Sequence, residues 1–349
     1  MTDSTLLTHD PDTLAPEAAA LLPRLADTDP VVRRIALLEL ADLEEPDTLP
    51  LIAHALAHDV SAEVRREAAR VLGSWEEAWI ADALCHALLD ADHDVRTAAA
   101  QSLSALKDDA CGPVLHRWTD HAEPFVQAAV LRGLRELRYA DALEPALRAL
   151  DHTDDSVRTE AVVLLGWLKD TRALAPLADT VTGDTNADIR RAAVGALGFA
   201  PATHTATLTA LLQALSDPVW QVREETATTL GKLRANAAHD VHDVHDVHKV
   251  HKVHKVHDAL IAALADDYWQ VRLRAVRALG HMGERAAALP IAALLSNPIS
   301  NLRKEAALAL GELREPATLP ALRDALNDAD PDVRKAVRIA LQQIEDASR

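Results

Sequence analysis

The sequence predicts an all-α fold, a right-handed α-solenoid of about ten helical hairpins with a period of about 31 residues. One observation is composition: 49% of the residues are hydrophobic but only 3% are aromatic, so the apolar content is mostly Ala, Leu and Val. Small and unbranched side chains favour close helix packing over sheets. The other observations are a motif that recurs along almost the whole chain and small residues at fixed positions within it.

The motif is clear in the segment Asp154–Gly166, and Val271–Gly280 and Asp330–Leu341 repeat its outline. We call its central position the marker; it is arginine in nine copies and Gln127 in the fourth. Consecutive markers lie 31 to 33 residues apart, except for one step of 49. Such a period indicates a repeat architecture. The marker arginines are Arg33, Arg65, Arg96, Arg158, Arg190, Arg223, Arg272, Arg303 and Arg334.

Small residues occupy two further positions of the repeat. Glycine at the eighth residue after the marker either ends a helix in a left-handed conformation or lets the next helix approach closely. Alanine at the third residue after the marker is expected to set the helix spacing. The glycines are Gly73, Gly166, Gly198, Gly231, Gly280 and Gly311, and the alanines are Ala36, Ala68, Ala99, Ala161, Ala193, Ala275 and Ala306.

Each repeat is predicted to be two short helices. The second begins at an Asp cap, followed by proline in Asp29–Pro30 and Asp330–Pro331, which is a helix start signal. One hairpin cannot bury its apolar face alone, so neighbouring hairpins must stack. We therefore expect a single array over residues 16–345, a disordered N-terminal tail at 1–15 and a C-terminal tail at 346–349.

The pattern D-x-x-V-R-x-x-A-x-x-x-L-G resembles the short HEAT-like repeat of phycobilisome bilin lyases, and it covers nearly the whole chain. In that repeat type the marker arginine pairs with Asp residues at repeat junctions, so the resemblance implies an internal ladder, interrupted at Gln127. It does not select a function, because similar repeats occur in adaptors, bilin lyases, deoxyhypusine hydroxylases and DNA-repair glycosylases.

Charge and local composition exclude several classes. With 36 basic and 54 acidic residues, the net charge of −18 argues against a nucleic-acid binder. No uncharged apolar stretch is long enough to span a membrane, and the N-terminus lacks a secretory signal pattern. Cys85 and Cys111 fit no metal or redox spacing and are interpreted as core residues in a reducing compartment. We expect a cytoplasmic protein.

The sequence predicts no catalytic activity of its own. It contains no H-E-x-x-H, G-x-x-x-x-G-K-[ST], G-x-S-x-G or C-x-x-C motif. No His is followed by Glu, so the His–Glu pairs of the di-iron hydroxylases are absent. A lyase-like activity is implied only by the resemblance.

Residues 239–256 account for the long step, because removing these 18 residues restores the period. They read (His-Asp-Val) three times and (His-Lys-Val) three times, and we place them in the loop between repeats seven and eight. Two interpretations are open: a tolerated expansion without function, or a weak site for Zn, Ni or Cu. No other cofactor is expected. The candidate ligands are His239, His242, His245, His248, His251, His254 and His257.

Two groups of residues are candidates for partner binding. Trp220 and Trp269 hold equivalent positions in the repeats that flank the insertion, with Tyr268 beside them; they are either interface anchors or packing at helix starts. The basic residues of the second helices form either a basic groove or a salt-bridged face. They are Arg34, Arg66, Arg191, Arg274, Arg277, Lys304 and Lys335.

These observations favour a monomeric, non-catalytic scaffold or adaptor that binds an acidic or extended segment of a protein through its concave face, as in an assembly or maturation factor. It is expected to bind neither nucleic acid nor membrane. The alternatives are a bilin-lyase-like or cofactor-enzyme accessory protein, and metal handling through the His-rich segment. His54, His58 and His86 lack a fourth ligand and are interpreted as surface residues.

Overall fold

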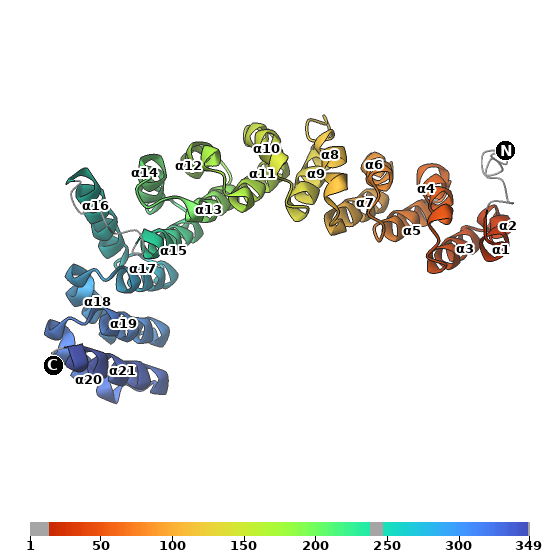
Figure 1. Cartoon of the computed structure of the whole chain (residues 1–349). Helices are drawn as coiled ribbons and strands as arrows, with labels where there is room; N and C mark the ends of the chain where they lie inside the picture. Colours follow the sequence, from red (N-terminus) through yellow and green to blue (C-terminus); the bar gives the residue numbers. More distant parts are fainter. Residues whose placement is uncertain (1–13, 238–246, 348–349) are drawn as a thin grey trace. The chain divides into compact units, whose positions relative to one another are not determined.

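The computed structural model describes residues 14–237 and 247–347. Within these ranges every regular element is a helix, which confirms the predicted all-α solenoid (Figure 1). The chain divides into two units, residues 1–168 and 169–349, and the described helices form five hairpins in each.

In unit 1 the second helix of every hairpin is the longer one. Short 3-10 turns precede several first helices. The α-helices are α1 (Pro16–Ala19), α2 (Leu22–Leu25), α3 (Pro30–Asp42), α4 (Leu49–His58), α5 (Ala62–Leu72), α6 (Ala78–Ala87), α7 (His93–Ala105), α8 (Gly112–His116), α9 (Pro124–Glu136), α10 (Leu143–Ala149) and α11 (Asp155–Leu168), and the 3-10 turns are η3 (Pro46–Thr48), η4 (Asp109–Cys111) and η5 (Ala140–Ala142).

Unit 2 has the same order of first and second helices. Its α-helices are α12 (Leu174–Gly183), α13 (Ala187–Ala196), α14 (Thr205–Ala214), α15 (Trp220–Ala237), α16 (Val247–Ala263), α17 (Trp269–Met282), α18 (Ala288–Ala293), α19 (Ser300–Leu313), α20 (Leu319–Asp324) and α21 (Pro331–Ala347). Its 3-10 turns are η6 (Thr171–Ala173), η7 (Leu197–Phe199), η8 (Arg285–Ala287), η9 (Leu294–Ser296), η10 (Pro316–Thr318) and η11 (Ala325–Asn327). Unlike in unit 1, α12 and α13 are equally long and α16 is longer than α17.

Each unit has two layers. The second helices α3, α5, α7, α9 and α11 pack side by side in unit 1, and α13, α15, α17, α19 and α21 do so in unit 2 (Figure 1). The first helices form the other layer. Leucines such as Leu72, Leu84 and Leu103 are completely enclosed between the layers, so the core runs along the stack and each hairpin depends on its neighbours.

The described helices reach nearly to both ends of the described residues. Helix α1 begins at Pro16, Leu14 is already buried, and α21 continues to Ala347, two residues past the predicted end at 345. Most of the predicted N-terminal tail, residues 1–13, lies outside the described residues. In the His-rich segment, residues 247–256 are helical rather than loop, because (His-Lys-Val) contains no helix breaker and runs directly into the rest of α16.

The repeated small residues serve close helix packing. All seven predicted alanines are completely buried. A Cβ atom on Gly280 would lie 2.9 Å from Cβ of Ala309 in the next repeat, and one on Gly231 would lie 3.0 Å from Cβ of Ala278. Of the two roles considered for this glycine position, close approach is the one these residues perform. Three residues further on, Gly283 ends its helix with φ +68°.

The left-handed helix ending therefore belongs to the eleventh residue after the marker. Besides Gly283, the described residues with positive φ are all at this position: Glu44, Arg138, Lys169 and Arg314. Four non-glycine residues accept this less favourable conformation, which turns their side chains out from the end of the helix.

The two cysteines are buried and free, which agrees with their interpretation as core residues. Burial raises the pKa of the Cys111 thiol to about 11, so this thiol is protonated at neutral pH. No described helix is both long and apolar enough to cross a membrane.

The glycine packing gives a matched pair of substitutions. Gly280→Ala should lower the free energy of unfolding by about 1–2 kcal/mol, because its methyl group overlaps Ala309 in a closely packed interface. Gly198→Ala, where a Cβ would meet no atom within 4 Å, should raise that free energy by about 0.5–1 kcal/mol by restricting the unfolded chain. Urea unfolding followed by circular dichroism measures both. A gain in stability for both variants would contradict the assigned role of Gly280.

Candidate partner-binding surface

The starts of the second helices are held by one repeated structure at the junction between hairpins. We call the sixth residue before each marker the junction residue. In all ten repeats its side chain accepts a hydrogen bond from the backbone N–H two residues later, at 2.8–3.1 Å. The junction residues are Asp27, Asp59, Asp90, His121, His152, Asp184, Asp217, Asp266, Asn297 and Asp328.

Each marker arginine contacts its own junction residue through the backbone. In all nine cases Nη1 donates to the junction carbonyl six residues earlier, at 2.7–2.9 Å. This bond fixes the guanidinium beside the turn, so that its other N–H groups face the next repeat. Where the next junction offers a carboxylate, the arginine can therefore link the turn of its own hairpin to the hairpin that follows.

At least five marker arginines also bind the junction aspartate of the next repeat through two N–H groups, with both partners largely buried. A bidentate pair of this kind is stronger and more specific in geometry than a single hydrogen bond. These pairs are the ladder that the resemblance implies. They are Arg33–Asp59, Arg65–Asp90, Arg190–Asp217, Arg223–Asp266 and Arg303–Asp328.

The ladder is interrupted in the middle of unit 1. Gln127 replaces the arginine, its buried Oε1 has no hydrogen-bond partner among the described residues, and the junction residue of the next repeat is His152. One repeat earlier, the junction residue that follows Arg96 is His121, and the Arg96 guanidinium lies over the ring of Phe125, 5.9 Å from its centroid. An imidazole can accept the turn hydrogen bond but brings no negative charge, so both junctions lack the ion pair.

A further junction without the ion pair lies in unit 2, between α17 and α19. The junction residue after Arg272 is Asn297, whose Oδ1 accepts the turn hydrogen bond from Ile299 N–H. The buried Nε of Arg272 has no partner among the described residues. Asparagine thus forms the turn without supplying the carboxylate, which leaves a buried donor unsatisfied.

The ladder changes the acidity of its carboxyl groups. Burial alone would raise the pKa of Asp217, but hydrogen bonds from Arg190 and from Val219 N–H outweigh burial and hold this pKa below its usual range. The same balance lowers the pKa of Asp90 and of Asp266. In Asp328 the hydrogen bond from Arg303 is the largest influence and also lowers the pKa. These carboxylates remain ionised well into the acid range.

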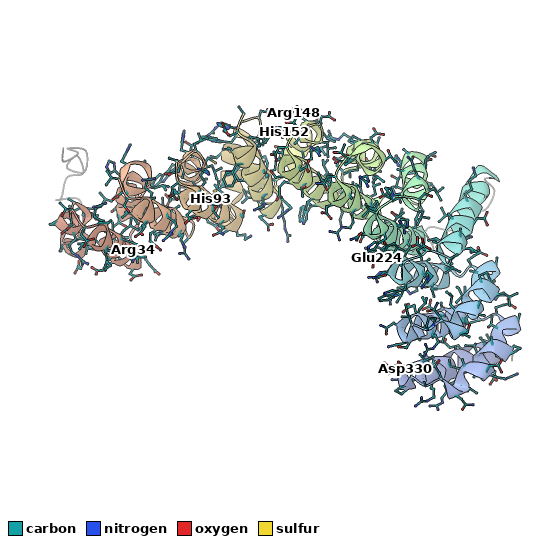
Figure 2. The ribbon with its side chains drawn as sticks, turned by 180° about the vertical axis from the view of Figure 1, so that it is seen from behind. Arg34, His93, Arg148, His152, Glu224 and Asp330 are labelled. Carbon is teal, nitrogen blue, oxygen red and sulfur yellow. The ribbon has the colours of Figure 1, made fainter. Side chains whose placement is uncertain are left out.

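Most of the predicted basic residues are already paired on the surface of the second helices. Arg66 lies 3.7 Å from Asp94, Arg274 3.0 Å from Glu224, Arg277 2.7 Å from Glu305 and Lys304 3.3 Å from Asp332, each on a neighbouring second helix; Figure 2 labels Glu224. Arg191 lies 3.5 Å from Asp188 in its own helix. Five of the seven cations thus belong to a salt-bridged face, in which exposed pairs contribute little stability.

The remaining two cations have no acidic partner among the described residues. Arg34, labelled in Figure 2, is half-buried on α3, and its buried Nε is unsatisfied. Lys335 is exposed on α21. A continuous basic groove is therefore not formed by the seven predicted residues, because charge pairing between repeats takes up most of them.

The aromatic candidates form one contact rather than a cluster of three. The rings of Trp220 and Tyr268 stack with centroids 5.4 Å apart at 14°. Arg223, a ladder residue, places its guanidinium 5.6 Å from the Tyr268 centroid. Trp269 is half-buried and makes no ring contact among the described residues. Stacking on a ladder arginine indicates packing at the helix start, while Tyr268 keeps an exposed side, 45% accessible.

The histidine candidates separate into different environments. His239, His242 and His245 lie outside the described residues, as do the side chains of His248, His251 and His254 in α16. His257 is buried and pairs with Glu284. The His54 and His58 rings contact each other, whereas His86 packs edge-on against Trp118. Among the described residues no three His, Cys, Asp or Glu side chains are grouped as metal ligands.

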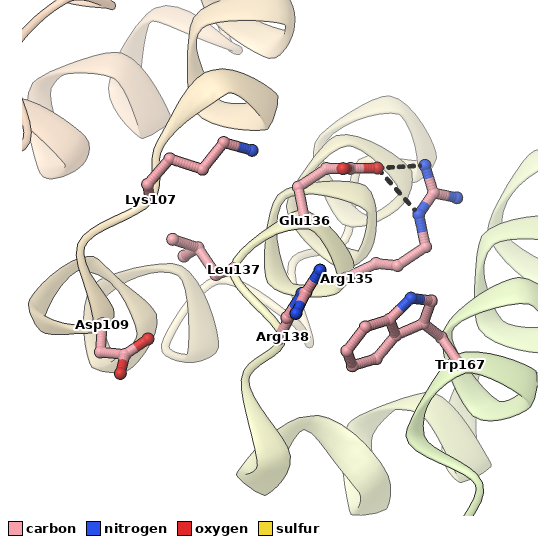
Figure 3. A pocket seen from close by; sticks show the side chains of 7 residues that line it. All are labelled: Lys107, Asp109, Arg135, Glu136, Leu137, Arg138 and Trp167. Atoms are coloured by element: carbon pink, nitrogen blue, oxygen red, sulfur yellow. Dashed lines mark hydrogen bonds and ion pairs between the residues drawn. The ribbon is translucent and has the colours of Figure 1, made fainter.

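A hollow of about 540 Å³ in unit 1 was not predicted from the sequence (Figure 3). It lies at the C-terminal ends of α7, α9 and α11, whereas the ladder lies at the starts of these helices. Basic, acidic and apolar side chains meet there. Its lining residues are Lys107, Asp109, Arg135, Glu136, Leu137, Arg138 and Trp167.

Two arginines in this hollow have different roles. Arg135 forms ion pairs with Glu136 at 2.8 Å and Glu160 at 3.0 Å, so its positive charge is neutralised within the protein. Arg138, in the left-handed position after α9, stacks over Trp167 with its Cζ 5.2 Å from the ring centroid. Neither Arg138 nor Lys107 has an ion-pair partner within the described residues.

Comparison with known protein families identifies the repeat. Residues 18–104, 55–124, 112–198 and 257–342 match a family of HEAT repeats, and residues 208–233 match the single HEAT repeat. The chain belongs to the HEAT-repeat family. Comparison of its sequence with curated proteins found no match.

Solved HEAT-like solenoids share the fold at low sequence identity. An engineered protein is 20% identical with a TM-score of 0.54, over 95% of this chain and 99% of the engineered one. Kap95p, from a structure with RanGDP, is 16% identical with a TM-score of 0.66, over 95% of this chain and 50% of Kap95p. Kap121p is 15% identical with a TM-score of 0.62, over 99% of this chain and 43% of Kap121p. This chain thus spans half or less of these two proteins.

One substitution can restore the missing ion pair between Arg272 and residue 297. Asn297→Asp keeps the turn acceptor and supplies a carboxylate to Arg272, so it should raise the free energy of unfolding by about 1 kcal/mol. Urea unfolding of this variant and of wild type measures the change.

Arg272→Ala serves as the control background. In that background Asn297→Asp should bring no gain in the free energy of unfolding, and a gain equal to that in wild type would contradict the assigned pairing.

The lowered pKa of Asp217 makes its contribution dependent on pH. A carboxyl group with a depressed folded-state pKa stabilises the fold above its unfolded pKa and loses this contribution as the pH falls through the folded value. Asp217→Asn should therefore lower the free energy of unfolding by about 1–2 kcal/mol at pH 7. The difference from wild type should shrink as the pH falls below about 4. Urea midpoints measured from pH 7 to pH 2 test this, and a difference independent of pH would contradict it.

Proposed function

We propose that this HEAT-repeat protein is a non-catalytic scaffold or adaptor that binds a protein partner through its second-helix layer. The observation that carries the proposal is exposed apolar surface on the second helices of unit 1. Twelve large hydrophobic residues are exposed among those described, and six of them lie on these helices: Val31, Ile35, Leu38, Phe125, Val163 and Trp167.

These side chains occupy positions that no described helix covers. The helices that carry them pack against neighbouring second helices and against the first helices of their own hairpins. Phe125 and Val163, 38% and 37% exposed, take repeat positions that are charged in other hairpins, such as Asp94 and Arg132. Exposed apolar side chains on adjacent helices, as on α9 and α11, suit a protein interaction site.

The ladder supports this role because it stabilises the stack from one end of the second helices. It leaves the outward side of those helices available for recognition. Solenoids of the same fold offer a precedent: Kap121p has been crystallised with Pho4p, with Nup53p and with the extreme C-terminus of Cdc14p. For this protein we propose that a monomer binds an extended segment of its partner.

A binding role also suits the chemistry of the hollow, whose lining residues include no nucleophile beside a general base. We propose that the protein acts in the cytoplasm, for which the two free, buried thiols are the support. The narrower likeness to bilin lyases rests on the sequence pattern alone, and a lyase-like role stays a prediction.

Site-specific photo-crosslinking in the native host tests the proposal. A benzophenone amino acid in place of Val163, or of Leu38, should form an adduct with the same partner protein, identified by mass spectrometry. The matched control is Leu89, which is at least as exposed and lies in the turn after first helix α6. Adducts from Leu89 alone, or an equal pattern from all three positions, would refute binding through the second helices.

A further inference from the structure

We propose that the hollow at the ends of α7, α9 and α11 binds acidic side chains of a peptide segment. The inference rests on the proposed function and adds the chemistry of the partner. Lys107, Arg135 and Arg138 bring three positive charges to the lining, against Asp109 and Glu136. Arg135 is paired with Glu136 and Glu160, so the charges available to a ligand are those of Lys107 and Arg138.

Arg138 is prepared to bind a carboxylate. The Arg138 guanidinium lies over the Trp167 ring, and its N–H groups donate no hydrogen bond among the described residues. The edge of a guanidinium binds a carboxylate through two parallel hydrogen bonds. Since the side chain is already held on the indole, less conformational entropy is lost when the ligand binds. The close view shows Arg138 between Lys107 and Trp167 (Figure 3).

The apolar part of the hollow selects for a peptide. Leu137 lines the hollow, and Trp167, 42% exposed, borders it. A tryptophan and an arginine together are typical of the residues that dominate protein interfaces. The volume, about 540 Å³, accommodates a few side chains. The fitting ligand is a short extended segment in which acidic residues flank an apolar one.

Charge argues for a peptide over a nucleic acid. A polyphosphate chain needs many neutralising cations, and the hollow has two free ones. Asp109 and Glu136 lie in the lining, and the whole chain carries a net charge of −18. Repulsion from these groups grows with every additional phosphate, whereas one or two carboxylates can be accommodated beside Lys107 and Arg138.

Fluorescence anisotropy of a labelled peptide, Ser-Glu-Glu-Leu-Glu-Glu-Ser, tests the proposal on the full-length protein at low salt. Wild type should bind it at least tenfold more tightly than the peptide with Gln in place of every Glu. Arg138→Gly should weaken binding at least tenfold. This variant is expected to fold, because Gly283 occupies the same left-handed position in another repeat, and circular dichroism checks it.

Arg314→Gly is the matched control. Arg314 has the same position in its repeat, the same left-handed backbone and the same charge, with Gln343 where the hollow has Trp167. Its affinity for the peptide should equal that of wild type. If both variants bound the peptide equally weakly, the loss would reflect the net charge of the protein rather than the hollow, and the proposal would be overturned.

Two further results would also overturn it: equal affinity for the Glu and Gln peptides, and displacement of the Glu peptide by a thymidine decanucleotide at lower concentration than by unlabelled peptide. These outcomes are separable from failure of the proposed function. If Val163 forms the crosslink but the peptide does not bind, only this inference fails. If the crosslink does not form, the proposed scaffold role fails.

Discussion

An arginine that recurs in nine of the ten repeats couples hairpins of this protein. It donates one hydrogen bond to the carbonyl of its own junction turn and, in at least five repeats, two more to the aspartate of the next junction. The same aspartate forms the turn that starts its own second helix. Helix start, turn and contact between repeats are therefore parts of one structure, and within each unit the paired junctions hold a hairpin against its predecessor.

This constraint determines which surfaces remain for function. Since the ladder holds the starts of the second helices and small residues bring their middles together, the outward positions of these helices are not needed for stacking. Phe125 and Val163 can remain exposed there without disturbing the core. The far ends of the same helices are also free of the ladder, and it is there that Arg138 and Trp167 meet. Recognition and stability are thus located on different parts of the same helices.

The repeated interactions could be predicted from the sequence, and the interactions specific to one place could not. The period and the recurring arginine predicted the hairpins, and the resemblance to the HEAT-like repeat implied the ladder and its interruption at Gln127. A salt-bridged face was one of the two interpretations of the basic residues, but the partners could not be named, because residues such as Arg277 and Glu305 lie on different helices, 28 residues apart. That spacing has meaning only once the repeats are in register. The hollow had a signal, since Lys107, Arg138 and Lys169 hold the same repeat position, but stacking on Trp167 depends on side-chain geometry.

The central claim is that the arginine–aspartate pair couples neighbouring hairpins, and a double-mutant cycle on Arg223 and Asp266 measures this coupling directly. Unfolding free energies of wild type, Arg223→Ala, Asp266→Ala and the double variant separate the pair energy from the other contacts of each residue. We expect a coupling energy of about 1.5–3 kcal/mol, as for hydrogen bonds between charged groups. A coupling energy near zero, with additive losses, would contradict the account.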